Sequence, residues 1–268
     1  DPHLLVMSAT PIPRTLALMI YGDLDVSILN ELPPGRQKID TFAVPSSYHE
    51  RIYAFLRKLV AEGRQAYIVC PMVSENDELP DERKAVTAYA EMLQKEVFPD
   101  LRIAPIHGKM KPKEKDAVMR AFAAHEIDVL VSTTVIEVGM NVPNATVITI
   151  TGADRFGFST LHQLRGRVGR GRDQAYCILQ TEAPNEKLEF LRSTTDGFLI
   201  AEKDLELRGP GTLFGDRQTG NNYFIDLMLA YPNMFQWIKK EAKHLCETQT
   251  GKDIVRRYEE LFLSEEKR

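Results

Sequence analysis

The sequence has little of what marks a membrane protein or a disulfide-stabilised protein. Its three cysteines lie far apart, at Cys70, Cys177 and Cys246. They form neither a metal-ligand spacing nor a disulfide framework, so we expect a protein of a reducing cytoplasm. No apolar run approaches the roughly 18 residues that a membrane helix needs, and the first residues do not have the pattern of a signal peptide. We therefore expect no membrane partner.

Charge of one sign is scarce as well. The 34 lysines and arginines stand against 38 acids and leave a formal net charge of −4. This balance disfavours a generic nucleic-acid binder, so any basic surface must be local. Apolar residues make up 43% and charged residues 27%, which is an ordinary globular composition. The length of 268 residues predicts about two domains.

A phosphate-binding loop is also missing. Such a loop needs G-x-x-x-x-G-K-[ST], but the Gly-Lys pairs at 108–109 and 251–252 are followed by methionine and aspartate. Magnesium-binding acids should end a buried strand, whereas the acidic pairs at 77–78 and 81–82 lie in a polar stretch with no strand before them. We therefore expect no metal ligands in this chain and no ATP hydrolysis by the chain alone.

Strands and helices are expected to alternate through the middle of the chain. The expected strands are 65–70, 102–106, 128–132, 145–151 and 175–180. The expected helices are 48–61, 86–97, 111–124, 161–168, 185–193 and 198–207, with two or three more in 223–268. A strand at 3–7, a helix at 13–21 and a turn-rich linker at 32–35 precede them. The alternation predicts an α/β fold with a parallel sheet covered by helices on both faces.

The strongest chemical signal is the segment QLRGRVGRG at 163–171, where arginines are interleaved with glycines. A solvated basic helix does not explain it, because glycine disfavours helix. Glycine lets the backbone approach a ligand, while guanidinium groups offer a fixed fork of donors to phosphate oxygens. The segment therefore predicts phosphate binding.

Four segments resemble, in the correct order, the motifs of superfamily 2 helicases and translocases. They are SAT at 8–10 (motif III), IHG at 106–108 (motif IV region), STTVIEVGMNVP at 132–143 (motif V) and QLRGRVGRG at 163–171 (motif VI). Three longer stretches resemble the RecG family of bacterial ATP-dependent DNA helicases. They are SATPIPRTL at 8–16, DLELRGPG at 204–211 and GDRQTG at 215–220.

This resemblance implies a RecA-like second helicase lobe at 36–181. The tail end of the first lobe and a linker would precede it at 1–35, and a translocation hairpin with C-terminal helices would follow at 182–268. The whole protein would be a bacterial cytoplasmic ATPase that remodels branched double-stranded DNA, such as stalled forks and Holliday junctions. A first lobe absent from this chain would hold most of the ATP and Mg²⁺, and an absent N-terminal wedge domain would read the branch.

The resemblance also implies residue roles on the nucleotide side. The catalytic candidates are Arg170, Arg167 and Gln163, with Arg170 the first choice for an arginine finger. The ATP-binding candidates in motif V are Glu137, Gly139 and Asn141. Many relatives have aspartate where this sequence has Asn141, which removes a charge there. The other arginines of the stretch, Arg165 and Arg172, are expected to be solvated or in salt bridges.

Further roles concern DNA and coupling. The DNA-binding candidates are Thr133, Thr134, His107 and Lys109. The coupling candidates are Ser8, Thr10, Lys187, Arg192, Arg208 and Gln218. Structural alternatives stay open: threonines after a strand can cap the next helix, and a histidine before glycine can serve packing alone.

Two other functions stay open as well. A transcription-repair coupling translocase of the Mfd type would share the motor motifs but lack the Arg-Gln-Thr-Gly of 217–220. A non-catalytic lobe that binds DNA or protein is compatible with the missing phosphate-binding loop, although the intact motif VI argues against it.

Overall fold

The computed structural model describes residues 38–71, 82–133, 141–208 and 231–265, together with Leu5, Met7, Ser27 and Leu29. The chain divides into two compact units. The first comprises residues 1–12 and 27–204, and the second comprises residues 13–26 and 205–268.

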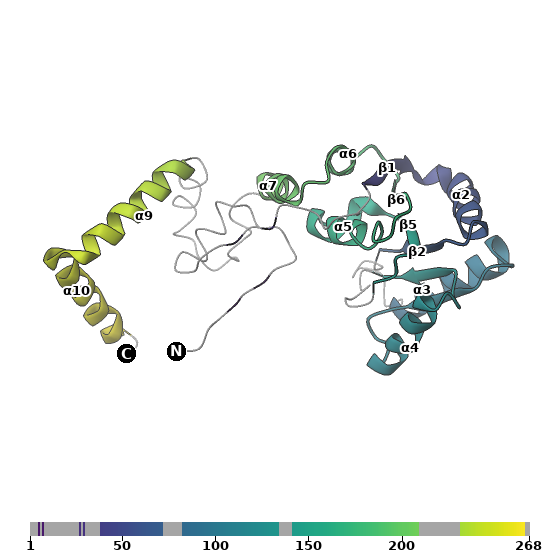
Figure 1. Ribbon diagram of the computed structural model, residues 1–268, viewed down its shortest axis with the longest axis horizontal. Coiled ribbons are helices and arrows are strands. Elements are labelled where there is room, and N and C mark those ends of the chain that lie inside the picture. The colour runs from purple at the N-terminus through teal and green to yellow at the C-terminus, as the bar shows by residue number, and fades with distance from the viewer. Residues whose placement is uncertain are drawn as a thin grey trace. The chain divides into compact units, whose positions relative to one another are not determined.

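A six-stranded sheet forms the centre of the first unit (Figure 1). Its strands are β1 (Ile39–Pro45), β2 (Gln65–Val69), β3 (Ile103–Ile106), β4 (Val129–Ser132), β5 (Ala145–Ile150) and β6 (Ala175–Thr181). They run in the order β1-β6-β5-β2-β4-β3, and every neighbouring pair is parallel. The predicted α/β parallel sheet is confirmed.

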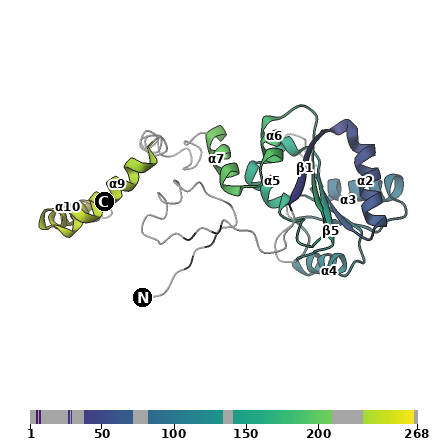
Figure 2. The ribbon, with the colours of Figure 1, turned by 45° about the horizontal axis from the view of Figure 1, so that its top comes forward.

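Helices cover both faces of this sheet. The described helices of the first unit are α2 (His49–Ala61), α3 (Glu82–Met92), α4 (Pro112–Ala123), α5 (Phe158–Arg165) and α6 (Glu186–Ser193), and α7 (Gly197–Arg208) belongs to it as far as residue 204. Short 3-10 turns, η1 (Ser46–Tyr48) and η3 (Ala153–Arg155), and a π-helical turn, η2 (Leu93–Val97), complete the set. Figure 2 shows α2 and α3 on one side of the sheet and α5 and α6 on the other.

The strand side chains alternate between two hydrophobic cores. On β2, Tyr67 and Val69 enter the core shared with α4, α5 and α6, whereas Ala66 and Ile68 enter the core shared with α2 and α3. All five residues of β2 are buried, as expected for a central strand of a parallel sheet with both faces covered.

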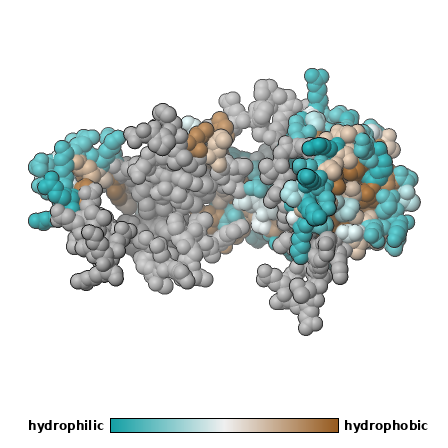
Figure 3. Space-filling view, turned by 90° about the horizontal axis from the view of Figure 1, so that it is seen from below, coloured by the Kyte–Doolittle hydropathy of each residue, from teal (hydrophilic) through white to brown (hydrophobic). Residues whose placement is uncertain are grey.

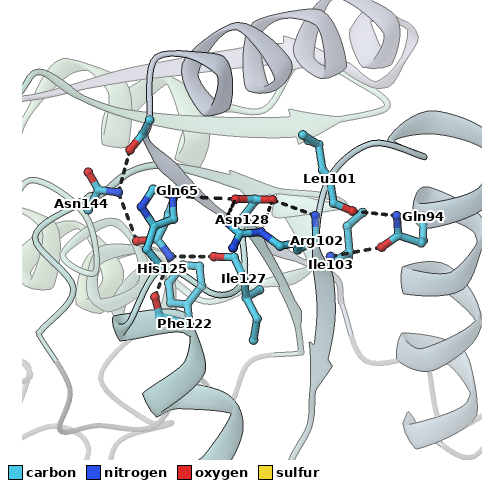
Figure 4. Close-up of polar contacts among 11 residues, drawn as sticks. Gln65, Gln94, Leu101, Arg102, Ile103, Phe122, His125, Ile127, Asp128 and Asn144 are labelled. Atoms are coloured by element: carbon cyan, nitrogen blue, oxygen red, sulfur yellow. Dashed lines mark hydrogen bonds and ion pairs between the residues drawn. The ribbon is translucent and has the colours of Figure 1, made fainter.

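A hydrogen-bond network closes the amino ends of the strands (Figure 4). The Gln65 side-chain amide donates to the carbonyls of Phe122 at 2.6 Å and Ile127 at 2.7 Å. The Asn144 amide donates to the carbonyl of Gly63 at 2.8 Å and to the Gln65 side-chain oxygen at 3.2 Å. Because these groups would be costly to leave unpaired, the network fixes α4, β2 and β5 relative to one another.

An ion pair extends this network. The carboxylate of Asp128 accepts hydrogen bonds from the backbone N–H of Arg102 at 2.8 Å and from its side-chain Nε at 3.0 Å and Nη2 at 2.5 Å. Burial alone raises the pKa of Asp128, but the hydrogen bonds from Arg102 outweigh it, so the pKa lies below its ordinary value.

In the second unit, the described helices are α9 (Pro232–Glu247) and α10 (Gln249–Glu265). They carry exposed apolar side chains, among them Trp237, Ile238 and Ile254, and the space-filling view shows such side chains beside hydrophilic ones (Figure 3). Within the described part of the chain, no helix is long and apolar enough to cross a membrane.

Most expected elements occur within a few residues of their predicted bounds. The bounds of the helix expected at 161–168 are wrong: both lie later in the chain than those of α5, which runs from Phe158 to Arg165. Strand β1 was missed, because its sequence IDTFAVP carries a polar pair and a proline among its apolar residues. The strand expected at 3–7 and the helix expected at 13–21 fall outside the continuously described residues.

Candidate functional site

Motif VI begins on α5 and continues into the connection to β6. The helix ends at Arg165, and Gly166 caps its C-terminus. Gly169 adopts a φ of 72°, and a Cβ on it would lie 2.9 Å from the Ile39 side chain. A Cβ on Gly171 would lie 2.6 Å from the carbonyl oxygen of Pro143. These two positions therefore require glycine for backbone conformation and for close approach to β1 and to the end of motif V.

Two arginines of this connection lie near Tyr67 of β2. Burial raises the pKa of Tyr67 to about 12, and the positive charges of Arg170 and Arg167 oppose this shift in part. The pKa of Arg167 is lowered by burial and by the neighbouring charge of Arg170. The Arg170 Nε donates to the carbonyl of Gly166 at 3.2 Å. The protein thus holds two like charges close together beside a buried phenol.

No carboxylate of the described residues forms an ion pair with Arg167 or Arg170. Both side chains are only partly buried. Two arginines held close together favour an anion beside them, and a guanidinium fork suits phosphate oxygens, so the pair is a candidate phosphate site.

The other nucleotide-side candidates are placed only in part. Gln163 is exposed on α5, and Asn141 is exposed two residues before Pro143, which meets motif VI at Gly171. The end of motif V therefore contacts motif VI at Pro143, just before β5. Glu137 and Gly139 lie outside the described residues.

Two DNA-binding candidates meet at the carboxyl ends of β3 and β4. Ile106 pairs with Ser132 in the sheet, so His107 and Thr133 follow neighbouring strands at the same edge. His107 is 5% exposed, and its Nδ1 has no hydrogen-bond partner among the described residues. Lys109 is exposed in the turn that follows. A buried polar atom without a partner at a strand end is a place where a ligand or water can bind.

The coupling candidates fall into two groups. Ser8, Thr10 and Gln218 lie outside the described residues, as does Thr134 of the DNA-binding set. Arg208 ends α7, and its side chain is not described. Lys187 is partly buried, and its ammonium donates to the carbonyls of Asp154 at 2.7 Å and Phe156 at 2.5 Å.

Arg192 of α6 is exposed and pairs with Glu189 at 2.7 Å. Lys187 therefore binds α6 to η3, whereas Arg192 lies on the outer surface of the helix. Both remain predicted coupling residues.

Arg165 departs from the expectation of a solvated or salt-bridged arginine. It is 3% exposed, and its guanidinium donates to backbone carbonyls at the end of α6. The sequence contained a signal, because Phe158, Leu161 and Arg165 are spaced i, i+3, i+7 on the buried face of α5. Arg172, by contrast, is exposed, as expected.

Neither cysteine of the first unit is suited to nucleophilic chemistry. Burial raises the pKa of Cys70 and of Cys177 to about 12, so both thiols stay protonated at neutral pH. The described residues contain no group of three or more His, Cys, Asp or Glu side chains that could hold a metal ion.

Comparisons with known proteins agree with this geometry. The family model of the helicase conserved C-terminal domain matches residues 50–172, which cover most of the sheet and motif VI. The first unit therefore contains a helicase C-terminal lobe. A second family model, for domain 3, C-terminal, of the ATP-dependent DNA helicase RecG, matches residues 194–262.

Individual relatives give the same family. The ATP-dependent DNA helicase RecG of Bacillus subtilis is 50% identical over 82% of this chain and 33% of its own length. RecG of Escherichia coli O157:H7 is 46% identical over 96% of this chain and 38% of its own length. A solved structure of RecG bound to a three-way DNA junction has a TM-score of 0.66 at 45% identity, covering 83% of this chain and 30% of that one.

The chain belongs to the RecG family of ATP-dependent DNA helicases. It spans about a third of the length of the curated relatives described above. The resemblance seen in the motifs is confirmed, and the match to RecG domain 3 favours RecG over the Mfd alternative.

Proposed function

We propose that the protein to which this chain belongs is an ATP-dependent helicase that remodels branched double-stranded DNA. In that protein, residues 36–181 form the second motor lobe, after the end of the first lobe at 1–35 and before the hairpin and helices of 182–268. The observation that carries the proposal is the pair Arg167 and Arg170 of a helicase C-terminal domain, with which no carboxylate of the described residues forms an ion pair. Such a pair suits the γ-phosphate of ATP bound by a neighbouring lobe.

The nucleotide roles follow from this placement. Arg170 and Arg167 neutralise charge on the transferring phosphoryl group, and Gln163 contacts the γ-phosphate or the attacking water. Glu137, Gly139 and Asn141 line the ATP side of motif V. ATP and Mg²⁺ are held mainly by the first lobe, because the sequence contains no phosphate-binding loop and its acidic pairs at 77–78 and 81–82 follow no predicted strand.

The DNA roles belong to the carboxyl ends of the strands. Thr133, Thr134, His107 and Lys109 contact phosphates of the duplex, which positions the motor without reading sequence. The Nδ1 of His107, which has no hydrogen-bond partner among the described residues, and the exposed position of Lys109 support this role. An N-terminal wedge domain reads the branch point in this proposal. The RecG relative whose solved structure contains a three-way DNA junction supports branched DNA as the ligand.

A third set of residues couples the nucleotide site to the DNA-binding site. Ser8 and Thr10 link the lobes, while Lys187, Arg192, Arg208 and Gln218 belong to the hairpin region that turns lobe closure into movement along DNA. Arg208 lies at the end of α7, directly before the Gly-Pro-Gly of 209–211, where glycine relaxes the backbone.

ATP hydrolysis tests the division of the site. We expect the purified chain to hydrolyse ATP at background rate with and without forked DNA, and the whole protein to hydrolyse it rapidly and unwind the fork. DNA-stimulated hydrolysis by the chain alone would contradict the split site. A whole protein that leaves forked DNA intact while hydrolysing ATP would contradict the helicase assignment.

A further inference from the structure

An exposed arginine between motifs V and VI lies at the carboxyl end of β5. Strand β5 ends at Ile150, and the turn η3 that follows ends at Arg155. Because the neighbouring strands of the sheet are all parallel, Arg155 lies at the same edge as His107 and Thr133, which follow β3 and β4. No carboxylate of the described residues, including that of its neighbour Asp154, forms an ion pair with Arg155. Within this part of the chain, its charge is therefore not neutralised.

The backbone that carries Arg155 is held firmly in place. Gly152 has a φ of 55°, and its carbonyl accepts a hydrogen bond from the N–H of Arg155 at 3.0 Å, which closes the turn. The Lys187 ammonium donates to the carbonyls on either side of Arg155, those of Asp154 at 2.7 Å and Phe156 at 2.5 Å. The arginine is therefore presented from a backbone that is bonded on both sides of it.

The stem of Arg155 lies over this turn, on the side of β2. A Cβ on Gly152 would be 3.7 Å from the Cδ of Arg155 and 3.1 Å from the Cγ of Pro71, the second residue after β2. The guanidinium begins one bond beyond Cδ, so it lies near the carboxyl ends of β5 and β2, and the residue is exposed. An arginine with a packed stem and an exposed head loses less conformational freedom when it binds a ligand.

The place of Arg155 along the edge matches the spacing of phosphates on one DNA strand. In the order β5-β2-β4-β3, Thr133 follows the second strand from β5, and His107 follows the third. With neighbouring strands about 4.8 Å apart, the ends of these strands are about 10 and 14 Å from the end of β5. Each phosphate of one strand of a duplex rises about 3.4 Å along the helix axis, so the three positions span about four phosphate steps. One backbone lying along this edge therefore reaches all three.

This location separates Arg155 from the arginine pair of motif VI. The connection that carries that pair packs at the amino ends of the strands, where a Cβ on Gly169 would meet Ile39 at the start of β1 and Ala175 at the start of β6. Arg155 lies at the opposite ends of the strands, beside the candidate DNA contacts. A guanidinium there suits a phosphate oxygen of the DNA backbone, because its donors form a fixed fork.

We infer that Arg155 binds a backbone phosphate of duplex DNA, on the same strand that His107 and Thr133 contact. The rigid turn places the guanidinium, and the spacing of the strand ends places it about four phosphate steps from His107. The inference rests on the proposed DNA-binding role of this edge. It adds a residue to that role and assigns the three contacts to one strand.

The whole protein provides the test, with the variants Arg155→Gln and Arg155→Lys. Glutamine removes the charge and keeps a polar side chain, whereas lysine keeps the charge and loses the fork. Arg172→Gln is the matched control, because Arg172 is also exposed and without an ion pair among the described residues, but it lies before the amino end of β6. The measurements are the affinity for two unbranched duplexes of different sequence over a series of salt concentrations, ATP hydrolysis against the concentration of the same duplexes, and the melting temperature.

We expect Arg155→Gln to weaken binding at low salt about fivefold, equally for both sequences, because a phosphate contact carries no sequence information. The slope of log affinity against log salt should become shallower by about 0.9, which corresponds to one phosphate contact. The DNA concentration for half-maximal ATP hydrolysis should rise by the same factor, while kcat at saturating DNA stays within about twofold of wild type. Arg155→Lys should keep the wild-type slope, and Arg172→Gln should match wild type throughout.

Four results would overturn the inference. One is an unchanged salt slope in Arg155→Gln, and another is an equal change in Arg172→Gln, which would show a general effect of surface charge. A lower kcat at saturating DNA with unchanged affinity would place Arg155 at the nucleotide site instead. A lower melting temperature in Arg155→Gln alone would show that the arginine serves folding. A wild-type protein whose ATP hydrolysis does not respond to DNA would instead overturn the proposed function.

Discussion

Two groups of arginines in the first unit differ in whether an acidic side chain pairs with them. At the amino ends of the strands, Arg102 is paired with Asp128, and Arg64 forms two hydrogen bonds to Asp173 at 2.5 and 2.7 Å. In motif VI, Arg167 and Arg170 lie close enough for one charge to lower the pKa of the other. The first group is neutralised and stabilises the fold, whereas the second has no acidic partner in the part of the chain that the structure describes.

This difference in charge pairing separates residues that stabilise the lobe from residues that lower its stability at a binding site. A paired charge is already satisfied and has no further ligand to bind. Like charges held together raise the free energy of the folded lobe until an anion binds between or beside them. Proteins keep such arrangements at sites and remove them elsewhere, so the charge pattern separates framework from site.

The largest expected effect is on ATP hydrolysis. In the whole protein, Arg170→Ala should lower kcat for ATP by about 10³-fold or more, because the charge on the transferring phosphoryl group loses its partner. Binding of branched DNA should change little. Steady-state hydrolysis and a DNA-binding titration measure the two effects, with Arg172→Ala as the control. Wild-type hydrolysis by Arg170→Ala would mean that the unpaired arginines are not an ATP site.

The glycines test how closely motif VI must pack. Gly169 and Gly63 both have positive φ, but only Gly169 has a neighbour, the Ile39 side chain, where a Cβ would be placed. Gly63→Ala should cost about 1 kcal/mol for its backbone conformation alone. Gly169→Ala should cost about 3 kcal/mol, because a steric clash is added. Urea unfolding of the chain measures both, and equal costs would show that Ile39 gives way.

The ion pair between Arg102 and Asp128 should make the stability of the lobe depend on pH. The folded-state pKa of Asp128 lies below its unfolded value, so the pair stabilises the lobe above about pH 4 and stops doing so as the pH falls through the folded-state pKa. Asp128→Asn should therefore lower the free energy of unfolding by about 1–2 kcal/mol at pH 7. The difference from wild type should shrink below about pH 4. A difference that is independent of pH would indicate a packing effect.

The smallest expected effect is an increase in the free energy of unfolding, whereas the glycine and Asp128 changes above lower it. Arg167→Gln removes one of two repelling charges, so it should raise the free energy of unfolding by about 0.5 kcal/mol while lowering ATP hydrolysis in the whole protein. The matched change in the first group, Arg64→Gln, removes the ion pair with Asp173 and should lower the free energy of unfolding by about 0.5–1 kcal/mol. Chemical denaturation of both variants measures the signs. Two changes of the same sign would remove the distinction drawn between the two groups.

Sequence patterns predicted the alternation of strands and helices, because buried parallel strands and amphipathic helices carry different periodicities. They missed β1, whose pairing with β6 joins residues that are far apart in the chain, such as Ile39 and Ala175. They also misjudged Arg165. The arginines of one short motif look alike in sequence, and only the neighbours that α6 supplies distinguish the buried one.

The sequence by itself determined the fold class, the family and the identity of the motifs. Local periodicity and the ordered motif residues are written in the chain and need no partner. Only the tertiary structure decided which arginine is bonded to the end of α6, which pair has no acidic partner among the described residues, and that His107 and Thr133 follow neighbouring strands at one edge. The physical reason is that burial and charge neutralisation depend on groups brought together from distant parts of the chain, such as Arg102 with Asp128 and Arg165 with Thr194.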